Sequence, residues 1–299
     1  MTDCSMPGKK RRLPALLVLL ACVAATTAAQ AKETLTWLLR DLPPLTIFEG
    51  PQKGNGAVDH LLPLLIAGMP EYQHNIQRVN RARGMQMLKE HNFTCDPTLL
   101  WTAERSKFLV FSVPSIGLLS NGLIVRQRDL AILEPFLHDR KIDLAALLAA
   151  QSIKVGLVAE RSYGEQLDGL LKTAPAHTLV PHYGNDAVGS LLQMQEAGRL
   201  KVVLGYWSEA RYQIQRQAMV ENEFAFFPIQ GVNTYQFIHV GCSDTALGRA
   251  AILRINQELA ALRRETLAGY YAQWLDPQLR SQYLQDAQSF FFEQGQRLP

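Results

Sequence analysis

The side chain in this sequence best suited to binding an anion is Arg105, in the run Thr102-Ala103-Glu104-Arg105. Thr102 is a favourable helix N-cap and Glu104 follows it within one turn, so the run predicts a short helical turn. On that turn Arg105 presents a planar fork of donors that suits a carboxylate or a phosphate. The alternative is an exposed ion pair between Arg105 and Glu104 or another neighbour, an interaction that is common and weak.

The elements expected before Arg105 alternate between strand and helix. Strands are expected at 34–40, 75–79 and 93–100, and helices at 58–66 and 82–89. This order predicts right-handed parallel crossovers and hence an α/β lobe. Ligands of such sheets bind at the carboxyl ends of the strands. The candidate ligand-binding residues at this edge, beside Arg105, are Pro44, Asn80, Thr98, Leu100 and Thr102.

A second alternation follows Arg105 and predicts a second α/β lobe. A strand expected at 108–113 still belongs to the first lobe. In the second lobe, strands are expected at 122–125, 153–158, 177–181, 201–204 and 223–227, and helices at 142–149, 187–197 and 208–220. Ser162 is predicted to cap a further helix that ends near Leu171. Because a helix N-terminus at the end of a strand can bind an anion or a polar ligand, Ser162 and Tyr163 are also candidate ligand-binding residues.

The N-terminal segment is typical of a secretory leader. Lys9 to Arg12 form a basic region, Leu13 to Ala25 an apolar one, and Ala29-Gln30-Ala31 a small-residue cleavage site. The apolar region is short for a helix that spans a membrane. We therefore expect cleavage before Lys32 and a protein located in the periplasm, with a lipid anchor at Cys22 as the alternative.

Cleavage changes the balance of charge. Residues 1–31 carry four basic residues and Asp3, so the 30 basic and 27 acidic residues of the whole chain become 26 and 26. A neutral chain without a basic run argues against nucleic acid as a partner. The cysteines that remain are Cys95 and Cys242, which in an oxidising compartment favour a disulfide, with two buried thiols as the alternative. Neither has a partner at C-x-x-C or C-x-x-H spacing, so we expect no metal site, and no cofactor.

Three motifs resemble the bacterial periplasmic solute-binding proteins of family 3, the amino-acid-binding type that serves ABC transporters, and in particular a poorly characterised branch of that family. They are Thr102 to Arg105 with Phe111-Ser112-Val113-Pro114, the turn Arg161 to Gly164, and the run Glu196 to Tyr206. The resemblance implies an α/β, two-lobe periplasmic-binding-protein fold of type II, in which each lobe is a mostly parallel sheet flanked by helices. Lobe 1 would comprise residues 32–118 and 234–299, and lobe 2 residues 119–233.

The resemblance also assigns roles to residues. It implies that Arg105 clamps the carboxylate of a ligand. It further implies that a strand at 234–240 returns the chain to lobe 1 beside the strand at 93–100, where Cys95 and Cys242 would meet.

Two positions depart from the family's pattern. The amino-acid binders hold the ligand's α-ammonium with an acidic residue where this chain has Tyr206, and Leu100 replaces a small hydroxyl residue. An α-amino acid is therefore not implied as the ligand. Tyr206 and Tyr163 would instead offer aromatic walls, the alternative being that both rings pack in a core.

The resemblance implies a monomeric extracytoplasmic protein that captures a small polar, carboxylate-bearing solute by hinge closure and delivers it to the permease of an ABC transporter. Arg105 and the helix terminus at Ser162 would lie on opposite walls of the cleft. The alternative is a ligand-sensing partner of a membrane signalling receptor. An enzyme on the same fold is a third possibility that we do not adopt, since the sequence offers no paired carboxylates, spaced histidine ligands or G-x-S-x-G elbow.

Overall fold

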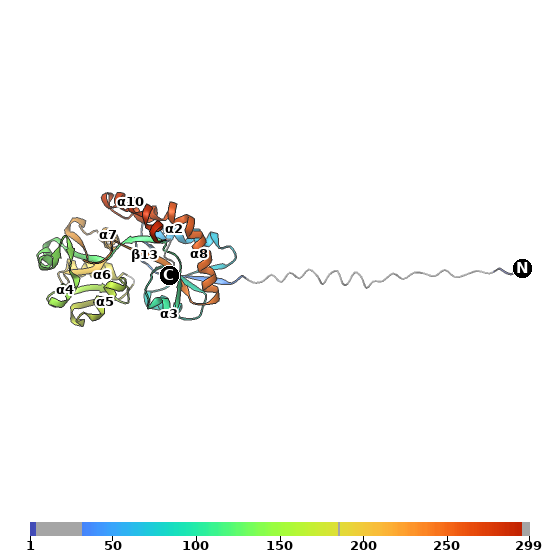
Figure 1. Ribbon diagram of the computed structural model, residues 1–299, viewed down its shortest axis with the longest axis horizontal. Coiled ribbons are helices and arrows are strands. Elements are labelled where there is room, and N and C mark those ends of the chain that lie inside the picture. The colour runs from blue at the N-terminus through green and yellow to red at the C-terminus, as the bar shows by residue number, and fades with distance from the viewer. Residues whose placement is uncertain (4–31, 185, 295–299) are drawn as a thin grey trace. The chain divides into compact units, whose positions relative to one another are not determined.

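The computed structural model describes residues 1–3, 32–184 and 186–294. The predicted leader and Cys22 lie in residues 4–31, outside the described residues. From Thr34 onwards the chain forms one compact unit that contains two main sheets, each with its own helices (Figure 1). Among the helices of the described residues, none is long and apolar enough to cross a membrane.

Lobe 1 is built on a sheet with the strand order β2-β1-β3-β13-β4, in which β5 also pairs with β13. Its strands are β1 (Thr34–Leu39), β2 (Gln73–Arg78), β3 (Thr94–Leu100), β4 (Leu109–Phe111), β5 (Ile116–Leu119) and β13 (Tyr235–Ser243). β1 is parallel to β2 and β3, whereas β13 is antiparallel to β3, β4 and β5. The expected return of the chain to its first lobe, beside β3, is confirmed.

Helices cover both faces of this sheet. They are α2 (Ala57–Gly68), α3 (Arg81–Lys89), α8 (Ala246–Glu265), α9 (Leu267–Ala272) and α10 (Pro277–Gln294), with a 3₁₀-helix η1 (Arg105–Lys107) after β3. Successive residues of a strand point to opposite faces, and β1 is apolar on both. Trp37 packs with α2, α8, α9 and α10 on one face, and Leu38 packs with α3 on the other.

Lobe 2 repeats this layering around a sheet with the order β10-β9-β11-β6-β12. Its strands are β6 (Gly122–Arg126), β9 (Val155–Val158), β10 (Leu179–His182), β11 (Val202–Gly205) and β12 (Phe224–Pro228), beside a small hairpin of β7 (Leu137–His138) and β8 (Lys141–Ile142). Its helices are α4 (Leu144–Ala150), α5 (Glu165–Thr173), α6 (Ala187–Glu196) and α7 (Trp207–Arg216), with 3₁₀-helices η2 (Gln127–Phe136), η3 (Ala176–Thr178) and η4 (Glu221–Glu223). Leu123 of β6 packs with α4 and α5, and its neighbour Ile124 packs with α6 and α7.

The expected fold, two α/β lobes with helices on both faces of each sheet, is confirmed. Residues 120–121 and 229–234 connect the two sheets. The sequence did not predict β5 or η2. β5 has only four residues after Pro114 and Ser115, which is too short to show the alternation of a strand.

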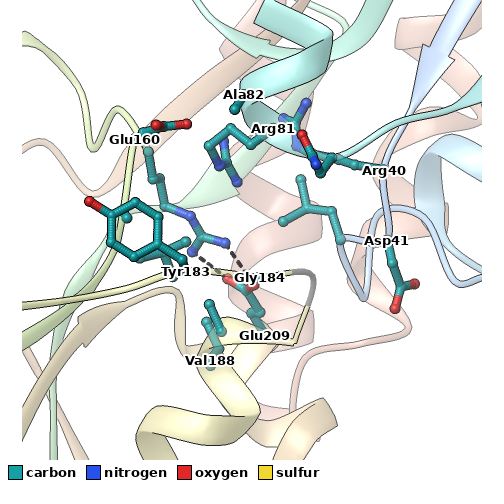
Figure 2. A pocket seen from close by; sticks show the side chains of 15 residues that line it. Arg40, Asp41, Arg81, Ala82, Glu160, Tyr183, Gly184, Val188 and Glu209 are labelled. Atoms are coloured by element: carbon teal, nitrogen blue, oxygen red, sulfur yellow. Dashed lines mark hydrogen bonds and ion pairs between the residues drawn. The ribbon is translucent and has the colours of Figure 1, made fainter.

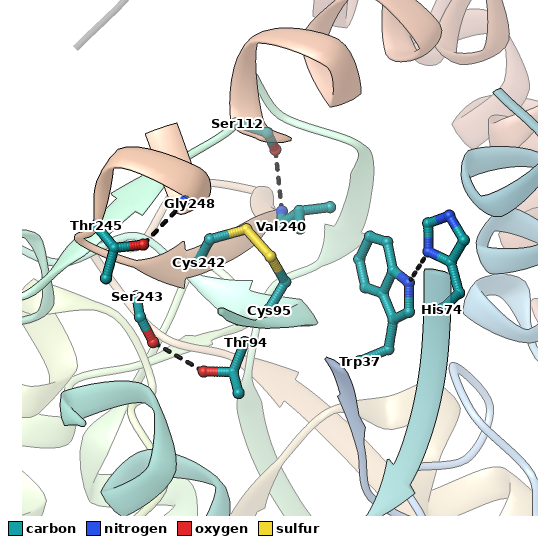
Figure 3. The surroundings of a disulfide bond; sticks show 10 residues. All are labelled: Trp37, His74, Thr94, Cys95, Ser112, Val240, Cys242, Ser243, Thr245 and Gly248. Carbon is teal, nitrogen blue, oxygen red and sulfur yellow. Dashed lines mark hydrogen bonds between the residues drawn. A yellow bond between two sulfur atoms is a disulfide. The ribbon is translucent and has the colours of Figure 1, made fainter. Parts of the chain in front are cut away.

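A disulfide joins the beginning and the end of lobe 1. Cys95 of β3 is bonded to Cys242 of β13, and the two lie opposite each other in the ladder with their Cα atoms 4.0 Å apart (Figure 3). The predicted disulfide is thus confirmed, and the alternative of two free thiols was wrong. The bond closes a loop with a sequence separation of 147 residues. In the chain-entropy model such a loop stabilises the fold by about 5 kcal/mol.

Candidate functional site

The turn that carries Arg105 has the local structure that the sequence predicts. The Arg105 N–H donates to Oγ1 of Thr102 over 3.2 Å, and Arg105 begins the 3₁₀-helix η1. Its Nη1 donates to the carbonyl of Leu100, the last residue of β3, over 2.8 Å. Glu104 forms its ion pair with Lys107 instead. The Arg105 side chain is therefore bonded to a backbone carbonyl and not to a carboxylate. Burial, and then the charge of Arg40, lower the pKa of Arg105.

Arg105 faces a small cavity between the lobes, which we call the central cavity. Its volume is about 30 Å³, and four of its lining residues are arginines while none is acidic. Lobe 2 contributes three of the lining side chains and lobe 1 the others. The lining residues are Arg40, Leu42, Leu45, Arg81, Thr98, Leu100, Arg105, Leu118, Arg161, Ser162, Tyr206 and Ile238. A cavity of this volume holds little more than one water molecule.

Two wider cavities share residues with the central one. The first, which we call the Arg81 cavity, has a volume of about 340 Å³ and also contains Arg40 and Arg161. Figure 2 shows Arg40 and Arg81 on one side of it, with Glu209 across from them. The second, which we call the Lys89 cavity, has a volume of about 600 Å³ and shares Arg105, Arg161 and Ser162 with the central cavity. The central cavity therefore lies between two wider openings.

Two of the four arginines are paired with carboxylates. Arg40, after β1, donates from Nη1 to Asp96 over 2.5 Å and from Nη2 to the Thr98 carbonyl over 3.3 Å. Arg161, after β9, donates from both terminal nitrogens to the two oxygens of Glu209, over 2.6 and 2.8 Å. Burial alone lowers the pKa of Arg161, but the Glu209 carboxylate outweighs it and the pKa is raised. Both arginines thus have a carboxylate bonded to them.

Arg81 is not paired. It is the first residue of α3, directly after Asn80, whose side-chain oxygen caps the helix by accepting from the Arg83 N–H over 2.8 Å. No hydrogen bond or ion pair joins the Arg81 guanidinium to any of the described residues. Its pKa is lowered well below the usual value by burial, and further by the charges of Arg40 and Arg161. Arg81 is thus a half-buried cation that lines the cavity without a counter-ion bonded to it.

Most of the residues predicted as ligand contacts lie at these cavities. Thr98, Leu100 and Tyr206 line the central cavity, and Thr102 lines the Lys89 cavity. The Thr98 N–H and hydroxyl both donate to Asp96, over 2.8 and 2.6 Å, so Thr98 helps to orient the partner of Arg40. Asn80 lines the Arg81 cavity.

Ser162 lies at the cleft, but not in the way that the sequence predicts. α5 begins at Glu165 after Gly164, whose positive φ of 97° suits glycine, so Ser162 precedes the helix and does not cap it. Its hydroxyl donates to Asp168 over 2.5 Å and accepts from the Gly164 N–H over 3.2 Å. The predicted cap was therefore wrong, although Ser162 still lines the central cavity.

Pro44 and Tyr163 do not line the central cavity. Pro44 is buried and its carbonyl accepts from the Ala57 N–H over 3.0 Å. The ring of Tyr163 is fully buried in the core of lobe 2, where its hydroxyl accepts from the Val158 N–H over 2.8 Å. Burial raises the pKa of Tyr163 to about 12. For Tyr163 the structure favours core packing, the alternative that the sequence left open.

Arg40, Arg81 and Arg161 line the central cavity but were not among the residues predicted from the sequence. Each follows a strand that is parallel to its neighbour, namely β1, β2 and β9, and so lies at the carboxyl edge where ligands of such sheets bind. That signal was present in the sequence, and arginines at this edge point to an anion. Within the described residues, no group of three or more histidine, cysteine, aspartate or glutamate side chains could hold a metal ion.

No protein-family model matches the sequence, and no match is found among curated protein sequences. The structure is similar to that of a histidine kinase sensor domain with similarity to periplasmic binding proteins, with a TM-score of 0.63 and 15% identity over 82% of this chain and 96% of that chain. It is also similar to the periplasmic VFT2 domain of BvgS from Bordetella pertussis, with a TM-score of 0.59 and 17% identity over 81% and 93% of the two chains.

A third similar structure is a substrate-binding protein of an ABC uptake transporter from Streptococcus pneumoniae with bound histidine. Its TM-score is 0.61 and its identity 13%, over 80% of this chain and 91% of that one. At these identities the likeness establishes the fold. The chain has the periplasmic-binding-protein fold, which it shares with amino-acid-binding proteins of ABC transporters and with sensor domains, so the resemblance noted from the motifs is confirmed at that level.

Proposed function

We propose that the protein is an extracytoplasmic solute-binding protein. It captures a small polar solute that bears a carboxylate, between lobe 1 and lobe 2, and delivers it to the permease of an ABC transporter. The observation that carries the proposal is the central cavity, because both lobes line it and Arg105 adds a guanidinium at its wall. The fold shared with the substrate-binding protein of an uptake transporter supports the same function. The predicted leader and the disulfide are both compatible with a periplasmic location.

Movement of the lobes about their two connections is the proposed mechanism of capture. Hydrogen bonds join the lobes in this structure; in two of them the Ala103 N–H donates to Glu165 over 2.7 Å, and the Gln236 side chain donates to the Tyr163 carbonyl over 2.6 Å. With these bonds in place the central cavity is too small for a solute, so the lobes must separate to admit one. A solute that contacts both walls then adds its own bonds to those between the lobes, and its affinity depends on both lobes.

A second candidate function is ligand sensing, in which the closed form acts on a membrane signalling receptor and not on a permease. The likeness to a histidine kinase sensor domain and to the BvgS VFT2 domain favours this candidate. Both candidates share the binding step and neither includes catalysis. Capture of partners from detergent-solubilised membranes by the tagged, ligand-bound protein separates them, because one predicts a transporter permease and the other a receptor.

The binding step is tested by the variant Arg105→Ala. We expect a thermal-shift screen against small carboxylates, amino acids, polyamines and short peptides to find a ligand for the unaltered protein. A ligand at a hundred times its Kd adds about 2.7 kcal/mol, which is a shift of several degrees for a chain of this size. We expect this shift to disappear in Arg105→Ala, because the guanidinium supplies charge-assisted hydrogen bonds to the carboxylate.

The matched control is Lys107→Ala, which removes an exposed cation from the same 3₁₀-helix and should leave the shift unchanged. An unchanged Kd in Arg105→Ala would remove Arg105 from the binding site. If no compound of the panel shifts the melting temperature of the folded protein, the result would count against a solute receptor and in favour of a role in binding another protein.

A further inference from the structure

More arginines line the central cavity than there are carboxylates bonded to them. Four arginines line it, and the two carboxylates bonded to them are Asp96 and Glu209, which leaves two positive charges without a bonded carboxylate. The two arginines concerned are Arg81 and Arg105. Closing the lobes around half-buried charges that lack a bonded carboxylate is unfavourable, since each charge loses part of its hydration. Anionic groups supplied by a ligand would therefore stabilise the closed state of the protein.

The carboxylates that line the Arg81 cavity are not bonded to Arg81. Both oxygens of Glu209 accept from Arg161. Asp41 lines the Arg81 cavity, but its carboxylate accepts from the Phe48 N–H, and Glu160 is exposed at the rim. Arg81 also begins the nine-residue helix α3, so the positive end of that helix adds to its charge. Burial and the neighbouring arginines disfavour its charged form, which an anion would relieve.

Arg105 stands in a similar position on the other side of the central cavity. Among the guanidinium nitrogens of Arg105, only Nη1 donates to a described acceptor, the Leu100 carbonyl. The other donors of the guanidinium remain for a ligand. The nearby carboxylate of Asp168 is held by the Ser162 hydroxyl and by the Tyr163 N–H, over 2.5 and 2.7 Å. Arg105 and Arg81 are thus two separate positions for an anionic group, and both line the same small cavity.

We propose that the solute is a dianion, a small dicarboxylate without an ammonium group, whose two carboxylates are bound by Arg105 and Arg81. This inference rests on the proposed function and specifies the class of its ligand. No acidic side chain lines the central cavity, so an ammonium group would meet four arginines and neutral hydroxyls there but no carboxylate. With one carboxylate at each end of the ligand, each of the four arginines that line the closed cavity would have a carboxylate bonded to it.

The test is calorimetric titration of the purified protein with matched ligands. Glutarate and succinate are the dianions, butyrate is the monoanion of similar length, and L-glutamate is glutarate with an added ammonium. Inorganic phosphate tests whether one compact anion suffices. We expect glutarate or succinate to bind at least tenfold more tightly than butyrate, L-glutamate and phosphate.

Variants assign the second carboxylate to Arg81. We expect Arg81→Gln to raise the Kd of the dicarboxylate by on the order of tenfold to a hundredfold, because a bidentate, charge-assisted contact is lost. The Kd of butyrate should change by less than threefold. Arg81→Lys keeps the charge but loses the planar fork and should fall between. Arg83→Gln, an exposed position on the same helix, should leave every Kd within twofold. Circular dichroism and an unchanged melting temperature establish that each variant is folded.

The outcomes separate this inference from the proposed function. Equal binding of butyrate or phosphate and the dicarboxylates, or a dicarboxylate Kd unchanged in Arg81→Gln, would overturn the assignment of a dianion to Arg81. Tight binding of a neutral amino acid, lost in Arg105→Ala, would overturn the dianion but keep a solute receptor. Absence of binding by every anion, amino acid, polyamine and peptide would overturn both.

Discussion

The two walls of the central cavity hold their arginines differently. In lobe 2, Arg161 is bonded through both terminal nitrogens to Glu209, and the two side chains are only 5% and 7% exposed. In lobe 1, Arg40 has Asp96 as its partner, but Arg81 and Arg105 have no carboxylate bonded to them among the described residues. One wall is therefore electrostatically complete without a ligand, and the other is not.

This difference predicts where a mutation will act. A change in a complete, buried pair leaves a charge without compensation and should appear in the free energy of unfolding. A change at an arginine without a partner removes little from the unliganded fold and should appear in ligand affinity. Lobe 2 would thus give a rigid wall, and lobe 1 the residues that select the solute. The three predictions that follow test this division.

The largest effect is expected for Glu209→Gln, which breaks the complete pair while it keeps the size of the side chain. Arg161 would remain charged and buried without a carboxylate, and removal of one partner from a buried pair costs about 3–5 kcal/mol. Urea denaturation measures the change. The matched control is Glu71→Gln, at an exposed pair with Arg254, where the cost should be below about 1 kcal/mol. Equal effects in the two variants would mean that the Arg161–Glu209 pair is no more than a surface contact.

The sequence predicted local features of this site better than distant pairings. The turn at Arg105 depends on Thr102, three residues earlier, and such short-range capping leaves a recognisable pattern. Arg161 and Glu209 are 48 residues apart and Arg40 and Asp96 56 residues apart, so their pairing exists only once the strands are assembled. The approach of Cys95 to Cys242 came from a family resemblance and not from spacing. The two-lobe fold was predictable because the sequence pattern shows strands and helices alternating along the chain, which is the order that an α/β lobe requires.

A smaller effect is expected for Tyr163→Phe, which tests whether this predicted ligand residue belongs to the rigid wall. The hydroxyl accepts from the Val158 N–H inside the core of lobe 2, and its loss leaves a buried donor without an acceptor. The cost should be about 1–3 kcal/mol in the free energy of unfolding. The Kd of the ligand should stay within about twofold, because the ring does not line the central cavity. A weakened Kd with unchanged stability would return Tyr163 to the binding site.

The smallest effect, and the opposite in sign, is expected for Arg81→Met in the unliganded protein. Methionine keeps an apolar stem of similar length and removes a half-buried charge that neighbouring arginines repel, so the free energy of unfolding should stay equal or rise by up to about 1 kcal/mol. Urea denaturation without ligand measures it, with Arg83→Met on the exposed side of α3 as the control. A loss of more than about 1 kcal/mol would show that Arg81 stabilises the empty protein. Lobe 1 would then resemble lobe 2, and Arg81 would no longer be a residue kept for the ligand.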